Sequence, residues 1–578
     1  MRNTYLIGKA FNSFLLASLL TVAATQVSAM IDGMMLSYFI GEYAMSSVNI
    51  CRPVMQLLFS LCMLMGAGSS MLVGMEIGNH RRTDANRIFT AVIAMVVVTG
   101  GAILTAGLTS LRPLVALLCS DESLRPVTGE FLGVTLYGAV FFMLSVTLEM
   151  FVAVDGSPKR VTAAVLACAV TNLALDYVFI SLVGWGVSGA AWATVIAYAV
   201  SVFVLLPHFL RPGTLRLAFR HCLATIPKSL GAGLPFGLAT ILIAVQLWGN
   251  NNIAMAYFGQ DGIIAISVCF YLLGLSMIVL SGTLKAFQPV ASILKGAGDE
   301  TGVLMVIRRA YRFMFICLIV FAAPMVLCPQ YVAMAFGIND PGALAMTGTA
   351  VTAFSANIML QCVIYLLIPI YQLYGNKAMA NFVSVGQSLA PVFGMWLLAE
   401  EAPALVWWGF ALGQAVIAVL IVVLASVVRI RRKNLIPLFL VPRDESVERF
   451  ETSIPPQTEA LGELLADVDT FLKKHFTDTS LVMHIEVSSE ELLKNIMQHG
   501  YGGQGGRHFI DYRMAVHPDH VSVVITDDAK AFNLTDYKEE TGYGLLLVRR
   551  LTKDIRYDYL FHQNMTTMTF LARQEKDS

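Results

Sequence analysis

Four side chains with oxygen ligands lie in segments that are otherwise almost wholly apolar. Asp32 lies in the first such segment, Asn172 and Asp176 lie four residues apart in a later one, and Thr194 lies in the next. A four-residue spacing places two side chains on one helix face, and a carboxylate at membrane depth costs about 2.5–3.5 kcal/mol, which marks it as a functional candidate. The set suits a sodium ion, whereas repulsion between the carboxylates favours binding of a proton. In the alternative interpretation, Asp32 lies near the outer interface and Asp176 is merely a hydrogen-bonded helix residue.

A second group of candidate residues lies near the C-terminus. Glu491 and Asn495 are one helical turn apart, so the acid could deprotonate a hydroxyl while the amide oxygen binds Mg²⁺. Asp527 follows a predicted strand and could accept a hydrogen bond from an exocyclic amine. Gly542 and Gly544 form a turn directly before a predicted helix, which suits phosphate binding by backbone amides. In this order and spacing, the residues indicate a nucleotide site.

The elements that must position these residues belong to two different regions. Charged residues make up 13% of the 578 residues and mean hydropathy is +0.68, whereas ordinary soluble domains carry about 25% charge. Residues 443–578 nevertheless hold 23 of the 39 acidic and 15 of the 39 basic residues. A polytopic membrane region therefore precedes a small acidic domain, and this acidity disfavours nucleic-acid binding. All nine cysteines precede residue 430 without metal-ligand spacing, which predicts buried free thiols.

Apolar runs of spanning length predict twelve transmembrane helices. The runs are 10–36, 47–75, 88–110, 130–154, 161–182, 188–208, 230–256, 262–290, 311–332, 346–370, 380–399 and 404–428. Twenty basic residues fall in the loops on one side of this arrangement and three on the other. The positive-inside rule then predicts a multi-pass protein of the cytoplasmic membrane, with both termini and the acidic domain in the cytoplasm.

The membrane region also contains an internal repeat. Gly41 and Gly78 of the first half recur as Gly259 and Gly296 of the second half, with the same spacing between them. The repeat shift, which carries Gly41 to Gly259, maps the first six helices onto the last six with parallel topology. Such a repeat favours a transporter with a cavity between two lobes. A channel or a receptor is the alternative.

At this point the chain resembles the multidrug and toxic compound extrusion (MATE) family. The resemblance rests on Ile31-Asp32-Gly33, Gly41-Glu42-Tyr43-Ala44, Asn172-Leu-Ala-Leu-Asp176, Gln288-Pro289 and Gly296-Ala-Gly-Asp299. It implies two six-helix lobes, at 8–220 and 221–430, that alternate access and export amphipathic, usually cationic compounds in exchange for H⁺ or Na⁺. It also implies that Asp32, Asn172, Asp176 and Thr194 form the cation site of the first lobe.

The second half lacks this acidic set. Under the repeat shift, Asn250 corresponds to Asp32, Ala390 to Asn172 and Gly394 to Asp176. We therefore expect coupling to reside in the first lobe.

The acidic region is predicted to begin with an extended linker over 431–456, rich in prolines and charges. Helical patterns follow at 457–475, 482–499 and 543–553. Alternating apolar residues predict strands near 510–516, 521–525, 555–562 and 565–572. These elements predict a small α/β two-layer sandwich over 457–573.

This region resembles the ATP-binding domain of gyrase and histidine kinases, most closely the anti-sigma-factor serine kinases. The resemblance implies Glu491 as catalytic base, Asn495 as Mg²⁺ ligand, Asp527 as adenine contact, and Gly542 and Gly544 as phosphate contacts. One departure from the family pattern Asp-x-Gly-x-Gly is that both of its glycines are alanines here, Ala529 and Ala531. The domain is therefore either a protein serine kinase or a degenerate module that binds a partner without hydrolysis.

Together these features predict an efflux antiporter driven by an ion gradient, with a cytosolic ATP-binding module. No GxxxxGK[ST] motif occurs, which excludes a P-loop motor. The expected partners are the lipid bilayer, small-molecule substrates and a cytosolic regulatory protein. The alternative is a membrane sensor whose twelve-helix part controls a kinase-like or docking module.

Overall fold

The computed structural model describes residues 2–40, 42–119, 122, 124–338, 340–431, 434–442, 447–501, 507–533 and 543–572. They divide into two compact units. The helical unit is Phe14–Val441, and the second unit combines Pro442–Ser578 with the N-terminal segment Met1–Ser13. Helix α1 (Tyr5–Phe39) begins in the second unit and continues into the helical unit.

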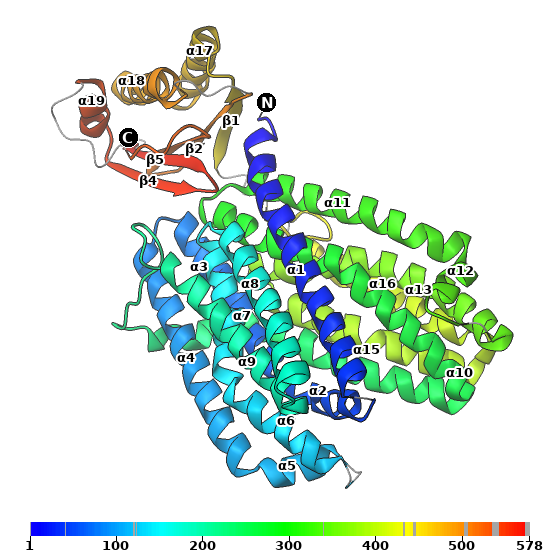
Figure 1. The fold of residues 1–578 in the computed structure, drawn as a ribbon. Coiled ribbons are helices and arrows are strands. Elements are labelled where there is room, and N and C mark those ends of the chain that lie inside the picture. Colours follow the sequence, from blue (N-terminus) through cyan, green and yellow to red (C-terminus); the bar gives the residue numbers. More distant parts are fainter. Residues whose placement is uncertain are drawn as a thin grey trace. The chain divides into compact units, whose positions relative to one another are not determined.

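Long apolar helices form the helical unit, because a backbone in lipid must satisfy its own hydrogen bonds. After α1, the first half contains α2 (Glu42–Cys62), α3 (Gly68–Gly78), α4 (Arg82–Thr109), α5 (Leu111–Leu118), α6 (Arg125–Tyr137), α7 (Ala139–Val154), α8 (Pro158–Asp176) and α9 (Gly186–Leu205) (Figure 1). The second half contains α10 (Ile226–Gly296), α11 (Glu300–Leu327), α12 (Pro329–Ala335), α13 (Pro341–Tyr365), α14 (Leu367–Leu373), α15 (Lys377–Glu401) and α16 (Gly409–Arg431).

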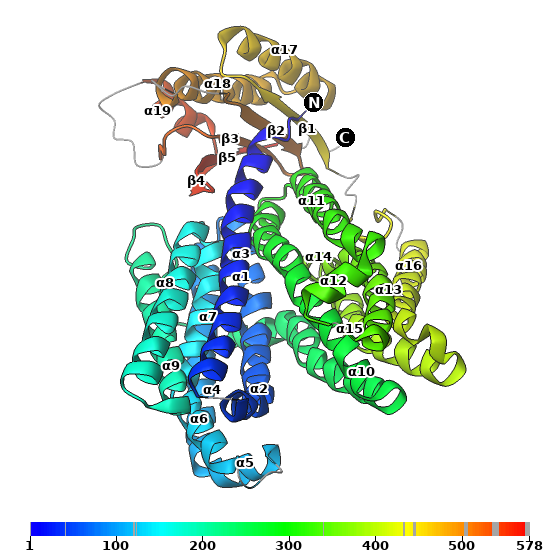
Figure 2. The same cartoon turned by 45° about the vertical axis from the view of Figure 1, so that its right-hand side comes forward.

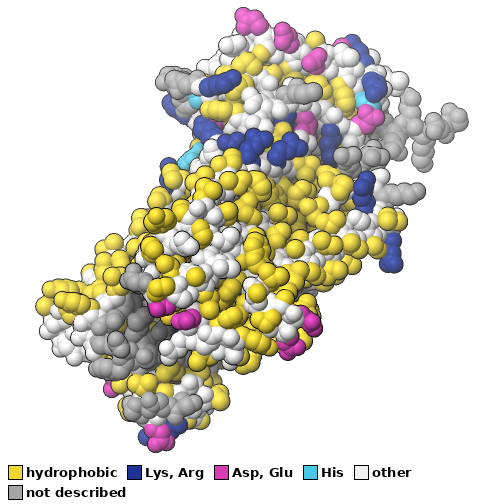
Figure 3. Space-filling view, turned by 90° about the vertical axis from the view of Figure 1, so that its right-hand side faces the viewer, with side chains coloured by type: hydrophobic (Ala, Val, Ile, Leu, Met, Phe, Trp, Pro, Cys, Tyr) yellow, Lys and Arg dark blue, Asp and Glu magenta, His cyan; other side chains and the backbone are white. Residues whose placement is uncertain are grey.

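Ten helices among the described residues are long and apolar enough to cross a membrane. Counting α6 and α7, which meet at a 51° bend, as one further span gives eleven. Helix α10 is counted once, yet its 71 residues are interrupted at Gly259, whose φ of +61° and ψ of −141° are not helical. At about 1.5 Å per residue, α10 has length for two spans of a hydrocarbon core about 30 Å thick. Figure 3 shows hydrophobic side chains across the surface of the helical unit.

The contacts between α3 and α10 come in pairs, and the internal repeat relates the two members of each pair to each other. A Cβ added to Gly78 would lie 2.0 Å from the carbonyl oxygen of Ile293, and one added to Gly296 would lie 2.0 Å from that of Met75. The repeat shift that carries Gly78 to Gly296 also carries Met75 to Ile293. The same reciprocity recurs where Gly237 packs on Leu64 and Gly282 packs on Leu19. Small residues let the two backbones cross closely, and the reciprocal pairs are those expected of a two-fold arrangement of the repeats.

The second unit is a two-layer α/β fold. Its antiparallel sheet has the order β1-β2-β3-β5-β4, formed by β1 (Glu448–Ile454), β2 (Ile510–Val516), β3 (His520–Asp527), β4 (Asp554–Leu560) and β5 (Gln563–Leu571). Helices α17 (Thr458–His475), α18 (Thr479–Asn495) and α19 (Tyr543–Leu551) lie together on one side of the sheet (Figure 2). Val468, Ile485, Tyr512, Val523 and Met568 are fully buried in the core between the layers.

Two features of this unit differ from the sequence-based expectation. Strand β1 lies inside the predicted linker 431–456 and pairs with β2 along its whole length. Edge strands are often charged, and Glu448, Arg449 and Glu451 made β1 look like a linker even though Ile454 joins the core. In addition, the first thirteen residues belong to this unit, whereas the sequence predicts only the start of a membrane helix there.

Candidate functional site

The first site brings together three helices of the first half. Asn172 on α8 and Asp32 on α1 face each other, and one end of the Asn172 amide lies 2.9 and 3.0 Å from the two carboxylate oxygens of Asp32. The other end lies 3.3 Å from Oγ1 of Thr194 on α9. The amide nitrogen therefore donates to the carboxylate, and the amide oxygen faces the hydroxyl. Three of the four predicted residues are thus in direct contact.

Asp176 completes the cluster from the end of α8. Its carboxyl group lies within hydrogen-bonding reach of that of Asp32, and its Oδ1 atom is buried without a partner among the described residues. Asp176 is 2% exposed and Asn172 is 5% exposed. Two carboxyl groups can approach this closely only when a proton or a cation lies between them. The cluster is therefore suited to binding one positive charge.

The backbone changes its winding directly after this cluster. Asp176 is the last residue of α8, and a π-helical segment, Tyr177–Leu182, follows it. Such wide turns occur often at functional sites, because they re-aim side chains and loosen the backbone hydrogen-bond ladder. The sequence carries no simple signal for this turn, and none of the motifs predicts it.

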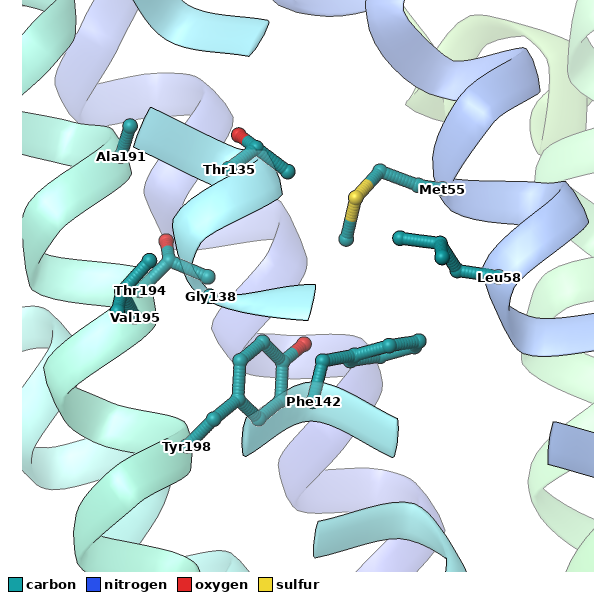
Figure 4. A pocket seen from close by; sticks show the side chains of 9 residues that line it. All are labelled: Met55, Leu58, Thr135, Gly138, Phe142, Ala191, Thr194, Val195 and Tyr198. Carbon is teal, nitrogen blue, oxygen red and sulfur yellow. The ribbon is translucent and has the colours of Figure 1, made fainter. Parts of the chain in front are cut away.

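A small pocket adjoins the cluster in the first half of the helical unit. Figure 4 shows its lining, to which Thr194 contributes together with Met55, Leu58, Thr135, Gly138, Phe142, Ala191, Val195 and Tyr198. Apolar and aromatic groups predominate, and hydroxyl groups of Thr135, Thr194 and Tyr198 supply polar contacts. Because Thr194 lines the pocket and also contacts Asn172, the cluster of polar residues and the pocket share one side chain.

The corresponding positions of the second half serve helix packing. A Cβ added to Gly394, the counterpart of Asp176, would lie 2.2 Å from the carbonyl oxygen of Gly409. One added to Gly413 would lie 2.1 Å from the carbonyl oxygen of Ala390, the counterpart of Asn172. Helices α15 and α16 therefore touch through their backbones where the first half carries an acid and an amide, which leaves no room for a carboxylate at position 394.

A charged pair joins the two halves of the helical unit. Nζ of Lys285 on α10 lies 3.6 Å from Oε2 of Glu149 on α7. Their side chains are 43% and 16% exposed, respectively. Lys285 is therefore paired with a carboxylate from the other half.

The second site lies at the ends of α18, α19 and β3. Glu491 and Asn495 occupy the last turn of α18, and a Cβ added to Gly544 would lie 2.1 Å from Oε2 of Glu491. The predicted base thus lies against the first turn of α19, and glycine at position 544 leaves space for it. Gly542 lies outside the described residues, so its predicted phosphate contact is not placed.

Asp527 ends β3 in a nearly closed environment. Its Oδ1 atom accepts hydrogen bonds from Nδ2 of Asn564, at 2.7 Å, and from the backbone nitrogen of Ala529, at 2.9 Å. Asn564 in turn accepts a hydrogen bond from the hydroxyl of Tyr557 at 2.7 Å. Burial raises the pKa of Asp527 from its usual 3.8 to about 6, although these hydrogen bonds lower it. Near pH 7 Asp527 is therefore mostly an ionised acceptor, held in place by Asn564, which sequence reasoning missed.

The two alanines that depart from the nucleotide-binding pattern have different surroundings. Ala529 is 4% exposed and packs against Gly500, where an added Cβ would lie 2.8 Å from the Ala529 methyl carbon. Ala531 is exposed. Of the two methyl groups, only that of Ala529 is therefore packed against other atoms. It fits because residue 500 is a glycine and has no side chain.

Two family models match the regions that contain the candidate sites. The MatE family model matches residues 17–178, and the model of the histidine kinase-like ATPase domain matches residues 454–570. The chain combines a MATE domain with a histidine kinase-like ATPase domain. The first match contains Asp32, Asn172 and Asp176, and the second contains the candidate residues Glu491, Asn495 and Asp527.

Curated relatives resemble each domain separately. The MATE domain is 22% identical over 270 residues to the multidrug export protein MepA of Staphylococcus haemolyticus, and 26% identical over 258 residues to the probable multidrug resistance protein YoeA of Bacillus subtilis. These alignments include 45% and 42% of this chain, and they span only 60% and 54% of the relatives' own lengths. The ATPase domain is 20% identical over 143 residues to the serine-protein kinase RsbW of Oceanobacillus iheyensis, an alignment that includes 22% of this chain and 89% of that kinase.

Solved structures share the fold of the helical unit. A MATE crystal structure in the bent conformation matches with a TM-score of 0.66 at 18% identity, and an outward-facing multidrug resistance MATE transporter matches with a TM-score of 0.66 at 19% identity. Each match covers 73% of this chain and 96% of the other chain. The MATE fold therefore extends well beyond the residues matched by the family model.

Proposed function

We propose that the MATE domain exports amphipathic, mostly cationic compounds across the cytoplasmic membrane in exchange for H⁺ or Na⁺. The observation that carries this proposal is the contact among Asp32, Asn172 and Asp176, in which two carboxyl groups lie close together within long apolar helices. The names of two relatives, a multidrug export protein and a probable multidrug resistance protein, support the export of varied compounds.

In this proposal the cluster binds one cation, and the loaded and empty forms favour different arrangements of two six-helix lobes. Thr194 connects cation binding to substrate binding, because it touches Asn172 and lines the adjoining pocket. Loss of the positive charge would leave two carboxylates in contact, and their repulsion would open the packing between α1 and α8. A substrate cation entering the pocket would then compete with the coupling ion for the same negative charge.

The ATPase domain is proposed to bind Mg-ATP and to regulate transport or phosphorylate a cytosolic protein. The residues present fit this ligand, since Asn495 offers an amide oxygen for Mg²⁺, Asp527 offers a buried acceptor for adenine, and Gly544 lies beside Glu491 at a helix start. Bound ATP would supply a transferable phosphoryl group. Glu491 would then act as the base that takes the proton from an attacking hydroxyl.

The test uses the purified full-length protein in proteoliposomes with an imposed H⁺ or Na⁺ gradient, with and without Mg-ATP. Export of a fluorescent organic cation driven by one of the gradients, without ATP, is the expected result. ATP is expected to change the rate without replacing the gradient. Transport that requires ATP and ignores both gradients would refute the assignment of the driving force.

A second candidate function is signalling, in which the MATE domain senses a ligand and the ATPase domain phosphorylates a partner. The observation that favours it is the match to a serine-protein kinase over 89% of that kinase's length. Phosphorylation of a cytosolic protein that depends on ligand, together with no gradient-driven flux in the same liposomes, would select this function over export.

A further inference from the structure

The N-terminal segment 2–13 makes ordered polar contacts with the sheet of the ATPase domain. Nε of Arg2 lies 3.1 Å from Oδ2 of Asp511 on β2, and Nη1 of Arg2 lies 3.7 Å from Oε2 of Glu451 on β1. The side chains of Arg2 and Asp511 are 5% and 1% exposed. The backbone nitrogen of Asn3 donates to Oγ of Ser453 at 2.7 Å, and Ser453 donates to Asp511 at 2.6 Å. The contact is therefore a buried network.

The segment also contacts β5, the fourth strand in the order of the sheet. Nε2 of Gln563 at the start of β5 donates to the carbonyl oxygen of Leu6 at 2.8 Å, and both residues are buried. The ring of Tyr5 lies 5.2 Å from that of Phe509, directly before β2. Residues 2–6 together therefore contact β1, β2 and β5.

This segment lies on the face of the sheet that the helices leave uncovered. Ile510 and Tyr512 point into the core beneath α17 and α18, so Asp511 between them points to the opposite face. Both ribbon views place the N-terminus beside β1 and β2 (Figures 1 and 2).

Lys9 connects this face to the nucleotide site. Its Nζ atom lies 2.6 Å from Oδ2 of Asp528, and Nδ1 of His508 lies 3.1 Å from the other oxygen of the same carboxylate. The Asp528 side chain has no exposed surface, and it directly follows Asp527, the proposed adenine contact. A buried carboxylate that loses a charged partner is strongly disfavoured, so the position of this loop depends on Lys9.

We propose that residues 2–9 are a resident ligand of the sheet face that the helices of the ATPase domain leave uncovered. We further propose that this docking links the loop after β3, which contains Asp528, to helix α1. The same continuous helix carries Asp32 further along its length, so the nucleotide site and the ion site act on one element. The link to nucleotide rests on the proposed ATP site, whereas the docking itself does not.

The docking is tested by photo-crosslinking in the full-length protein. The photoreactive residue p-benzoylphenylalanine replaces Phe509, and mass spectrometry after trypsin digestion identifies what it captures. Capture of the tryptic peptide 3–9 is expected, because Tyr5 is the neighbouring ring. The same probe at Phe476, which packs against the helical side of the core, is the matched control and should not capture it. Absence of peptide 3–9 from the Phe509 cross-links would overturn the docking.

The link to nucleotide is tested by Mg-ATP affinity in the full-length protein. Lys9→Gln is expected to weaken binding about fivefold or more, the usual lower range for coupling between sites, whereas Lys9→Arg retains the ion pair and should stay near wild type. Lys473→Gln removes an exposed Lys–Asp pair of α17 and is the control for charge loss. Wild-type affinity in Lys9→Gln would overturn the link. If the wild-type protein binds no ATP, the proposed nucleotide site and this link both fail, and the cross-link alone decides the docking.

Discussion

Replacing Asp527 with asparagine should stabilise the ATPase domain while weakening its recognition of adenine. Burial raises the pKa of Asp527 from 3.8 to about 6, so the folded state holds the proton more tightly than the unfolded state. The stabilisation from this proton is complete below pH 3.8 and disappears as the pH rises through 6. At pH 7 the buried charge therefore costs roughly 3 kcal/mol, from about two pKa units at about 1.36 kcal/mol each.

Asparagine at position 527 removes this cost, and its side-chain oxygen can still accept from Asn564 and from the nitrogen of Ala529. Hydrogen exchange of the β3 amides in the full-length protein measures the change, because these amides exchange through opening of the domain. At pH 7 exchange should slow by up to about 100-fold. At pH 4.5 the difference in free energy of unfolding between the variant and the wild type should shrink to about 1 kcal/mol, since the folded wild-type residue is then protonated.

The control for this experiment is Asp519→Asn, at an exposed acid before β3, which should change exchange little at either pH. ATP affinity and the preference for ATP over GTP should both fall in Asp527→Asn, because an acceptor for the exocyclic amine is lost. Equal or faster exchange in Asp527→Asn at pH 7, or a difference that does not change with pH, would refute the reasoning from burial.

Three further predictions concern the same domain. Gly544→Ala should abolish phosphoryl transfer with little loss of stability in thermal unfolding, because the new Cβ displaces the flexible end of Glu491; retained activity would contradict the contact. Gly500→Ala should destabilise the domain by about 1–3 kcal/mol in hydrogen exchange, by overpacking against Ala529, and the added change Ala529→Gly should restore it. Removal of Mg²⁺ by a chelator should weaken ATP binding in the wild type but have little further effect in Asn495→Ala, as measured by titration calorimetry.

The helices and strands of the ATPase domain could be predicted closely because their apolar patterns are regular. The predicted helix 457–475 is observed at Thr458–His475, and the predicted strand 510–516 is observed with the same bounds. Strand β1 could not be predicted in this way, since an edge strand has one uncovered side and can carry charges at positions that a central strand would bury.

The membrane cluster was accessible from sequence because carboxylates in apolar segments are rare and a four-residue spacing fixes their common face. The contact between the Asn172 amide and Asp32 joins helices that lie far apart in the sequence, and only the family resemblance suggested it. The π-helical turn after Asp176 had no such signal, because a π-helix differs from an α-helix in its hydrogen-bond spacing and not in its composition.

The role of the N-terminal segment was the hardest to predict. Arg2 and Lys9 are basic residues at the start of an apolar run, and the positive-inside rule accounts for them fully. Their partners Asp511 and Asp528 lie near the opposite end of the chain, beyond the whole membrane region. Only the folded structure shows that these two charges are used in specific ion pairs.

Gradient-driven efflux by single variants in proteoliposomes tests the central claim most directly. Asp32→Asn and Asp176→Asn should each lower efflux by about tenfold or more, since coupling between two sites is typically worth about 1–3 kcal/mol. Asn250→Ala, at the corresponding position of the second half, should remain within about twofold of wild type, as expected where coupling is absent. Near wild-type efflux in both aspartate variants, reconstituted at equal protein levels, would contradict the assignment of the coupling site.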